Sequence, residues 1–240
     1  MIFAVPLYDD NPTARDPIVT YLLIGLCVGA FLWQVGQNEL GHQRAILYGY
    51  GMIPAELFGL WHPTRAYQVV PAWATLVTSM FLHGGWFHLI GNMLFLWIFG
   101  KNVEDAFGWV RYLVLYFAGG FVAMLLQTAM TLWFGTTADS QVPELGASGA
   151  IAAVLGAYFI LYPGSRVATW VFPVFVVKIP AWVFLGLWFL YQLIEANFGL
   201  FSASANGGSV AFFAHVGGFL FGLVAARILT GAGRVVPQTQ

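Results

Sequence analysis

Residues 146–162 read GASGAIAAVLGAYFILY and contain no charged side chain. A helix that spans a membrane needs about 20 residues, and this run covers most of that length. Ser148 follows the end of a polar loop at Gly146, so we expect it in the first turn of the helix. Small residues recur at Ser148, Ala152 and Gly156, and such a stripe allows two membrane helices to approach closely. The stretch therefore predicts a membrane helix that starts near a serine and packs tightly against a second helix.

The composition of the whole chain places this helix in a membrane protein. The 240 residues are 60% hydrophobic and 8% charged, and the mean hydropathy is +0.78. An average soluble domain carries about 25% charged residues, so this chain lacks the charges for a polar shell. The formal net charge of −1 provides no basic surface for nucleic acid. A single cysteine, Cys27, excludes an intramolecular disulfide.

Charged residues separate the apolar runs and predict six membrane spans in a single domain over residues 1–240. The expected fold is an all-α polytopic membrane protein. The spans are expected at roughly 18–36, 79–100, 112–134, 147–162, 179–198 and 209–230. The first of them follows a start without the basic patch of a signal peptide, so we expect it to persist as a helix.

The segments between the spans carry three further expectations. Residues 39–68 are mixed in character and predict a long loop. Residues 167–177 are apolar but broken by Pro173, and are expected near the membrane interface. A water-exposed turn is expected at Lys101, Glu104, Asp105 and Arg111.

The placement of lysine and arginine predicts the orientation of the spans. With the N-terminus inside, seven of these residues fall on inner segments and two on outer ones. The inner set is Arg15, Lys101, Arg111, Arg166, Lys178, Arg227 and Arg234, and the outer set is Arg44 and Arg65. Because cytoplasmic segments carry such an excess, we expect a cytoplasmic N-terminus, with the even-numbered spans starting on the outer side.

Three polar clusters interrupt the apolar runs, each near the start of an even-numbered span. They are His83-Gly-Gly-Trp-Phe-His88-Leu-Ile-Gly-Asn92, Gly146-Ala-Ser148-Gly149 and Ala214-His215-Val-Gly-Gly218-Phe-Leu-Phe-Gly222. Polar side chains are costly inside a membrane and tend to be functional. The three starts share one side of the membrane, so the clusters are expected at similar depth, as an assembled site requires.

Ser148 and His215 are the candidate reacting pair. Taken alone, each is also explained by a helix–helix contact or hydrogen bond. However, Ser148 is expected at a helix N-terminus, where free N–H groups and the helix dipole favour a developing oxyanion. His215, expected about two turns into the sixth span, shares a face with Gly218 and Gly222. Packing of the two small-residue stripes would bring the pair to about 3 Å, the distance needed for proton transfer.

No carboxylate is expected in these three spans at that depth, so the predicted site is a serine–histidine dyad. His88 and Asn92 lie four residues apart on one helix face. They are candidates either for interhelical hydrogen bonds or for an oxyanion hole completed by the Ser148 amide. His83, nearer the membrane surface, is expected to fix the loop through a hydrogen bond.

Two other hydrolytic classes are disfavoured. A zinc hydrolase would show His-Glu-x-x-His, which this chain lacks, so we expect no metal at the histidines. An aspartyl protease would need two buried aspartates, whereas all five aspartates of this chain are expected in loops. Glu195 is expected at the membrane interface.

At these residues the chain resembles the rhomboid family of intramembrane serine proteases. The resemblance rests on His88-x-x-x-Asn92, Gly146-Ala-Ser148-Gly149 and Ala214-His215-x-x-Gly218-x-x-x-Gly222, in this order. Gly-x-Ser-Gly alone would be a weak signal, but three motifs at the starts of alternate spans are specific. The resemblance covers nearly the whole chain, and residues 9–12 and 82–86 resemble prokaryotic members.

The resemblance implies Ser148 as nucleophile, His215 as general base, and an oxyanion hole made by Asn92, His88 and the Ser148 amide. It implies single-span membrane proteins as substrates, cut near the outer end of their helix and often after a small residue. In the family, the fifth span and the following loop move to admit substrate, and residues 202–209 fit a mobile cap. We expect no cofactor, and a location in a prokaryotic plasma membrane.

The sequence departs from the family pattern at two positions. A Trp-Arg pair that some members carry in the first loop is replaced here by Trp73-Ala74. A tyrosine that in some members stacks on the histidine is replaced by Ala152, so His215 must be oriented by another group.

Two other functions compete with proteolysis. A catalytically inactive relative could bind transmembrane helices, but it would have no need of both Ser148 and His215. A channel or transporter would carry polar residues across the whole membrane, whereas the inner halves of the even-numbered spans are Leu, Phe, Ala and Gly.

Overall fold

The computed structural model describes residues 4–37, 40–171, 173, 175–201, 212–233 and 235. The helices are α1 (Ile18–Gly36), α2 (Leu40–Tyr50), α3 (Pro54–Leu57), α4 (Ala72–Thr78), α5 (Trp86–Phe95), α6 (Lys101–Phe107), α7 (Trp109–Phe134), α8 (Ser148–Leu161), α9 (Ala181–Phe201) and α10 (Phe212–Gly231). The strands are β1 (Ala4–Asp9), β2 (Arg166–Val171) and β3 (Phe175–Pro180). Short helical turns are η1 (Arg65–Tyr67), η2 (Ser79–Phe81), η3 (Leu96–Gly100) and η4 (Asp139–Gln141).

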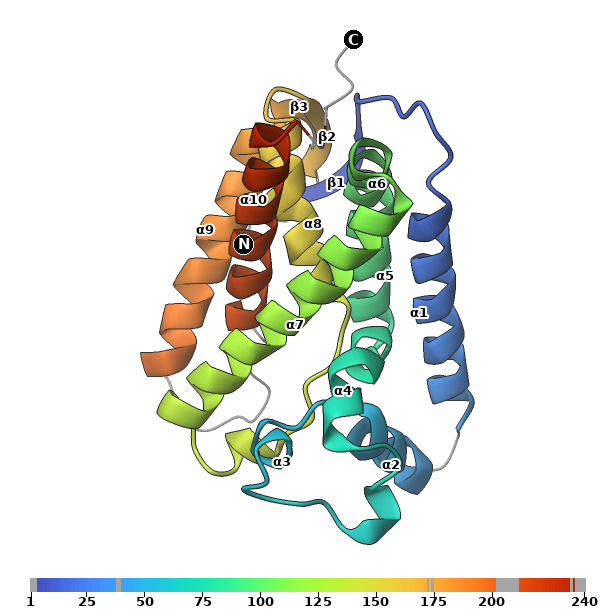
Figure 1. Cartoon of the computed structure of the whole chain (residues 1–240), viewed down its shortest axis with the longest axis vertical. Coiled ribbons are helices and arrows are strands. Elements are labelled where there is room, and N and C mark those ends of the chain that lie inside the picture. The colour runs from blue at the N-terminus through green and yellow to red at the C-terminus, as the bar shows by residue number, and fades with distance from the viewer. Residues whose placement is uncertain are drawn as a thin grey trace.

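The long helices form a bundle with different structures at its two ends. The sheet and α6 lie at one end, and α2, α3 and α4 lie at the other (Figure 1). Three helices in the described part of the chain, α1, α7 and α10, are long and apolar enough to cross a membrane. Residues 65–81 and 86–107 form a fourth candidate with a bend of 79°, while α8 and Ala181–Glu195 of α9 are shorter apolar helices. The protein is therefore a multi-pass helical membrane protein, and the count of six spans stays a prediction.

The second span differs from the continuous helix predicted over 79–100. The chain leaves its helical path after Phe81, and α5 starts only at Trp86. Gly84 and Gly85 lie in this break, and two consecutive glycines disfavour helix. The π-helical turn η3 then carries α5 into α6, so the helical path continues to Phe107.

The prediction of a water-exposed turn at Lys101, Glu104, Asp105 and Arg111 is wrong, because the two acidic side chains are buried. Glu104 and Asp105 lie in α6 with 6% and 7% of their surface exposed. The Glu104 carboxylate accepts hydrogen bonds from the amides of Val19 (2.9 Å) and Thr20 (2.7 Å), at the start of α1. Pro17, the N-cap of α1, has no side chain that can accept a hydrogen bond from the first amides of the helix. The Glu104 carboxylate, distant in sequence, accepts these hydrogen bonds instead.

The long loop predicted over 39–68 contains helices α2 and α3, and one aspartate expected in a loop lies in a strand. Asp9, in β1, is buried and forms an ion pair with Lys101 at 3.0 Å. Tyr158 donates a hydrogen bond of 2.7 Å to the same carboxylate. Burial of this charge is therefore compensated by a cation and a hydroxyl.

A three-stranded sheet adds to the helices of the expected all-α fold. Most of residues 167–177 belong to its strands β2 and β3, and their position near the membrane interface stays a prediction. β2 pairs with both neighbours in antiparallel fashion, in the order β1-β2-β3. Its residues include Val167, Thr169 and Val171, whose branched side chains favour strands. The sheet therefore ties the N-terminal segment to the connection between α8 and α9.

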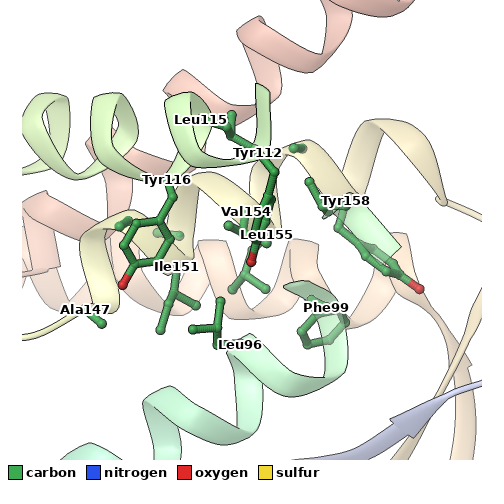
Figure 2. Packing of buried hydrophobic residues seen from close by; sticks show 14 of the residues in the cluster. Leu96, Phe99, Tyr112, Leu115, Tyr116, Ala147, Ile151, Val154, Leu155 and Tyr158 are labelled. Atoms are coloured by element: carbon green, nitrogen blue, oxygen red, sulfur yellow. The ribbon is translucent and has the colours of Figure 1, made fainter. Parts of the chain in front are cut away.

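Helix α8 lies at the centre of the bundle. Every residue from Gly149 to Tyr158 is buried, which accounts for a stretch with no polar face. Tyr112 and Tyr116 of α7 pack beside Ile151 and Leu155 of α8, with Leu96 facing them from below (Figure 2). The helix that carries Ser148 is therefore held on several sides by close-packed side chains.

Candidate active site

The polypeptide before Ser148 is fixed by its backbone. Ser148 is the first residue of α8. Gly146 has a φ of +126°, a conformation that favours glycine, and its amide donates to the Ser79 carbonyl at 2.9 Å. A Cβ at Gly146 would lie 2.8 Å from the His88 ring. Gly146 therefore allows both the turn into α8 and the approach of His88.

His215 reaches Ser148 from α10. Its Nε2 lies 2.8 Å from Ser148 Oγ, a hydrogen-bond distance across 67 residues of sequence. His215 lies in the first turn of the described part of α10, which starts at Phe212. The predicted start of this span, at about residue 209, lies outside the described residues, so the depth of His215 in the span stays a prediction. The two side chains thus meet at the same end of two adjacent helices.

Glycines set the spacing between α8 and α10. A Cβ at Gly218 would overlap the carbonyl of Gly149, and one at Gly222 would overlap the carbonyl of Ala153. A Cβ at Gly156 would likewise overlap the carbonyl of Phe219. The two backbones are therefore in direct contact, which is the close approach expected of small-residue stripes.

Two residues of α9 also contact the His215 ring. The Gln192 amide oxygen lies 2.7 Å from His215 Nδ1, and Gln192 is buried, with 5% of its surface exposed. The Trp188 ring lies 5.9 Å from the imidazole, centroid to centroid. Ala152 is buried, and the aromatic contact with the histidine comes from Trp188 of α9.

His88 lies beside the serine, and Asn92 lies one turn further along α5. The Gly84 amide donates to His88 Nδ1 at 3.3 Å, so a neutral ring carries its proton on Nε2. Asn92 is 8% exposed, and its Nδ2 has no hydrogen-bond partner among the described residues. Each side chain therefore has an N–H group available for hydrogen bonding.

His83 has contacts of a different kind. It is fully buried, and the Gln34 side chain donates to its carbonyl at 2.8 Å and accepts from its amide at 3.3 Å. Its ring lies edge-on to His88, with centroids 5.2 Å apart. These contacts fix the bend before α5. In the described ranges, no group of three or more His, Cys, Asp and Glu side chains gathers as a metal site would require.

A chain of polar side chains, with Gln127 buried and Thr131 and Glu144 half-buried, contacts the start of the described part of α10. The Ala214 amide donates to Gln127 Oε1 at 3.2 Å, and Gln127 is hydrogen-bonded to Glu144 and Thr131. Burial raises the pKa of Glu144 to about 8, while the hydrogen bonds from Gln127 and Thr131 oppose that rise. Protonated and ionised forms of this carboxyl are therefore both accessible near neutral pH.

Sequence reasoning missed Gln192, Gln127 and Glu144 as neighbours of the site. A signal for the first two was present, because each is an amide inside an apolar run, as conspicuous as Ser148 in its own run. Nothing in the sequence indicated that Glu144, which is half-buried, contacts Gln127. The predicted loop at residues 202–209 lies outside the described residues.

The fold and the site define an integral multi-pass membrane protein with a serine–histidine pair among its helices. A family model described as the Rhomboid domain matches residues 71–232. The chain therefore belongs to the rhomboid family, a family of intramembrane serine proteases.

Several relatives from eukaryotic organelles are similar to this chain. Rhomboid protein 1, mitochondrial, of Saccharomyces cerevisiae is 28% identical over 196 residues, which cover 76% of this chain and 53% of the relative. Rhomboid-like protein 11, chloroplastic, of Arabidopsis thaliana is 31% identical over 175 residues, covering 68% and 55%. Presenilin-associated rhomboid-like protein, mitochondrial, of Rattus norvegicus is 28% identical over 149 residues, covering 58% and 38%. The matched regions thus cover about half or less of the length of these relatives.

Proposed function

We propose that this protein is an intramembrane serine endopeptidase with Ser148 and His215 as its catalytic dyad. The observation that carries the proposal is the 2.8 Å distance between Ser148 Oγ and His215 Nε2. The second ring nitrogen faces an amide oxygen of Gln192, an acceptor, so the proton of a neutral imidazole resides on Nδ1. Nε2 is then free to accept the serine proton.

The proposed reaction has two stages. His215 Nε2 takes the Ser148 hydroxyl proton while Oγ attacks the carbonyl carbon of the scissile peptide bond. The resulting oxyanion collapses, the C–N bond breaks, and Nε2 returns the proton to the leaving amine. Water then attacks the acyl-enzyme and gives a proton to Nε2. Collapse of this second intermediate returns the proton to Oγ and releases the carboxylic acid.

The oxyanion hole is proposed to consist of the His88 Nε2–H, the Asn92 amide and the Ser148 N–H. His88 is suited to donate because its Nδ1 already accepts from the Gly84 amide. Asn92 contributes a buried donor that no described residue satisfies. The Ser148 N–H lies at the start of α8, where backbone amides lack intrahelical acceptors. Donors fixed before charge develops stabilise the transition state most effectively.

The proposed substrates are single-span membrane proteins, cut near the outer end of their helix and often after a small residue. Cleavage requires local unwinding, because carbonyls in an intact helix are held in hydrogen bonds. We assign the sheet end of the bundle to the cytoplasm of a prokaryotic cell. Lys101, Arg166 and Lys178 belong to that end, whereas Arg44 and Arg65 belong to the opposite one (Figure 1).

The competing function is an inactive relative that binds transmembrane helices without cutting them. Such a protein has no need for a hydrogen-bonded serine–histidine pair. Labelling of the purified protein with a fluorophosphonate, which reacts with activated serines, separates the two functions. We expect wild type to be labelled and to cleave a single-span reporter, and both Ser148→Ala and His215→Ala to do neither. A wild-type protein that neither labels nor cleaves contradicts the protease proposal.

A further inference from the structure

We propose that Gln192 is a positioning residue that holds His215 in the tautomer needed for catalysis. The inference rests on the proposed dyad and adds a third residue, contributed by α9. It starts from the 2.7 Å hydrogen bond between Gln192 Oε1 and His215 Nδ1.

The two hydrogen bonds of the His215 ring determine each other. A neutral imidazole has one N–H donor and one bare nitrogen acceptor. An amide oxygen can only accept, so Nδ1 must carry the proton and Nε2 must be bare. Ser148 Oγ, 2.8 Å from Nε2, is then the donor of its hydrogen bond. The Gln192 oxygen thus selects the one tautomer in which His215 can remove the serine proton.

Burial makes this selection effective. Gln192 is 5% exposed, so water has little access to compete for Nδ1. Without the amide oxygen, the buried Nδ1–H would be left unsatisfied, and the tautomer protonated on Nε2 would become the more favourable one. That tautomer donates to Ser148 and cannot act as its base.

The orientation of the ring depends on the same helix. Trp188 lies one turn before Gln192 on α9 and contacts the imidazole at 5.9 Å between centroids. Phe212, the first described residue of α10, contacts the ring edge-on at 6.4 Å. Among these contacts, the Gln192 oxygen is the group that distinguishes one ring nitrogen from the other.

Three variants at this position test the proposal. Gln192→Met keeps the length of the side chain and removes the acceptor, and we expect labelling by the fluorophosphonate and kcat to fall about 10- to 100-fold, with KM changed less than twofold. Gln192→Glu keeps an acceptor oxygen in either protonation state, and we expect it to retain at least a third of the wild-type labelling rate. Leu190→Met, at an exposed position of α9, is the control for a new methionine in this helix, and it should match wild type.

A spectroscopic measurement tests the tautomer without relying on activity. In protein with ¹⁵N-labelled histidine, the His215 signals, assigned by their loss in His215→Ala, should show protonated Nδ1 in wild type and Gln192→Glu. In Gln192→Met the proton should move to Nε2. Because this readout needs only folded protein, a fall in activity through loss of structure can be recognised.

The outcomes separate this proposal from the function on which it rests. A Gln192→Met protein that labels at the wild-type rate, or that keeps the proton on Nδ1, overturns the positioning role and leaves the dyad intact. A wild-type protein that fails to label overturns the dyad and the positioning role together.

Discussion

Helix α10 packs against both α8 and α9, and the two interfaces differ in kind. Towards α8 the contact is backbone against backbone, because Gly156, Gly218 and Gly222 leave no room for a Cβ. Towards α9 the contact is made by side chains, among them Trp188 and Gln192 against His215. The first interface fixes how far His215 lies from Ser148, and the second fixes how its ring is turned. The distance between His215 and Ser148 is thus set by the backbone contact between α8 and α10. The orientation of the His215 ring depends on α9 side chains, which can change rotamer.

The largest effect is expected from adding a methyl group to the interface between α8 and α10. In Gly222→Ala the new Cβ overlaps the carbonyl of Ala153, so α8 and α10 must separate. We expect a loss of stability of about 3 kcal/mol or more, together with a loss of labelling of at least 100-fold. Thermal unfolding and fluorophosphonate labelling in the same detergent provide both numbers.

Gly186→Ala in α9 is the matched control, because a Cβ there meets nothing within 4 Å. It should keep its activity and gain a fraction of a kcal/mol in stability, since alanine favours helix by about 1 kcal/mol over glycine. Equal effects of the two substitutions would contradict the close contact between α8 and α10 as the cause of the loss in Gly222→Ala.

The second largest effect is expected from removing a donor of the proposed oxyanion hole, which belongs to neither interface of α10. Asn92 lies on α5, so Asn92→Ala should leave both packing arrangements unchanged. As a proposed oxyanion donor it should slow cleavage by about 10²–10³-fold with little change in melting temperature. A reporter cleavage assay measures this, and a wild-type rate would remove Asn92 from the mechanism.

The third effect is a pH dependence of stability at the start of α10. The folded-state pKa of Glu144, about 8, lies above its ordinary value of 4.5. Between these values the folded protein keeps a proton that the unfolded chain releases, so the Glu144 contribution is complete below about pH 4.5 and is lost as pH rises towards 8. We expect wild type to lose at least about 2 kcal/mol across that window.

Glu144→Gln should remove most of this dependence, since an amide does not titrate. Glu195→Gln, at a half-exposed position of α9, provides the control and should keep the wild-type pH dependence. Unfolding measured at several pH values between 5 and 8 compares the three proteins. An unchanged slope in Glu144→Gln would show that another group is responsible.

The smallest effect is expected from removing the aromatic contact between α9 and His215. Trp188→Leu removes the ring beside His215 but leaves the Gln192 hydrogen bond in place. We expect labelling to fall about 3- to 10-fold, because aromatic contacts contribute about 0.5–1.5 kcal/mol. Trp188→Phe should recover most of the rate. A loss larger than that of Gln192→Met would show that stacking, and not the tautomer, governs the histidine.

The outline of the fold followed from local features of the sequence. α1 begins and ends where the apolar run 18–36 predicts, and Ser148 begins α8 directly after the loop. The bend before α5 was not predicted, although Gly84 and Gly85 disfavour helix there. The continuation of the helical path to Phe107 was not predicted either, because charged residues such as Glu104 usually mark contact with water. Glu104 is buried since it caps α1, whose amides lie 84 and 85 residues away in sequence.

The sequence by itself determined the class of protein, a helical membrane protein, because a chain with 8% charged residues cannot form a polar surface. It also marked Ser148, His215, His88 and Asn92, since polar side chains are conspicuous in apolar runs. Only the tertiary structure decided the sheet and the partners of His215. Strand pairing between β1 and β2, and the contact of Gln192 with Nδ1, join residues that no local pattern relates. Such contacts depend on how whole helices and strands pack in space, and helical periodicity and charge spacing carry no information about them.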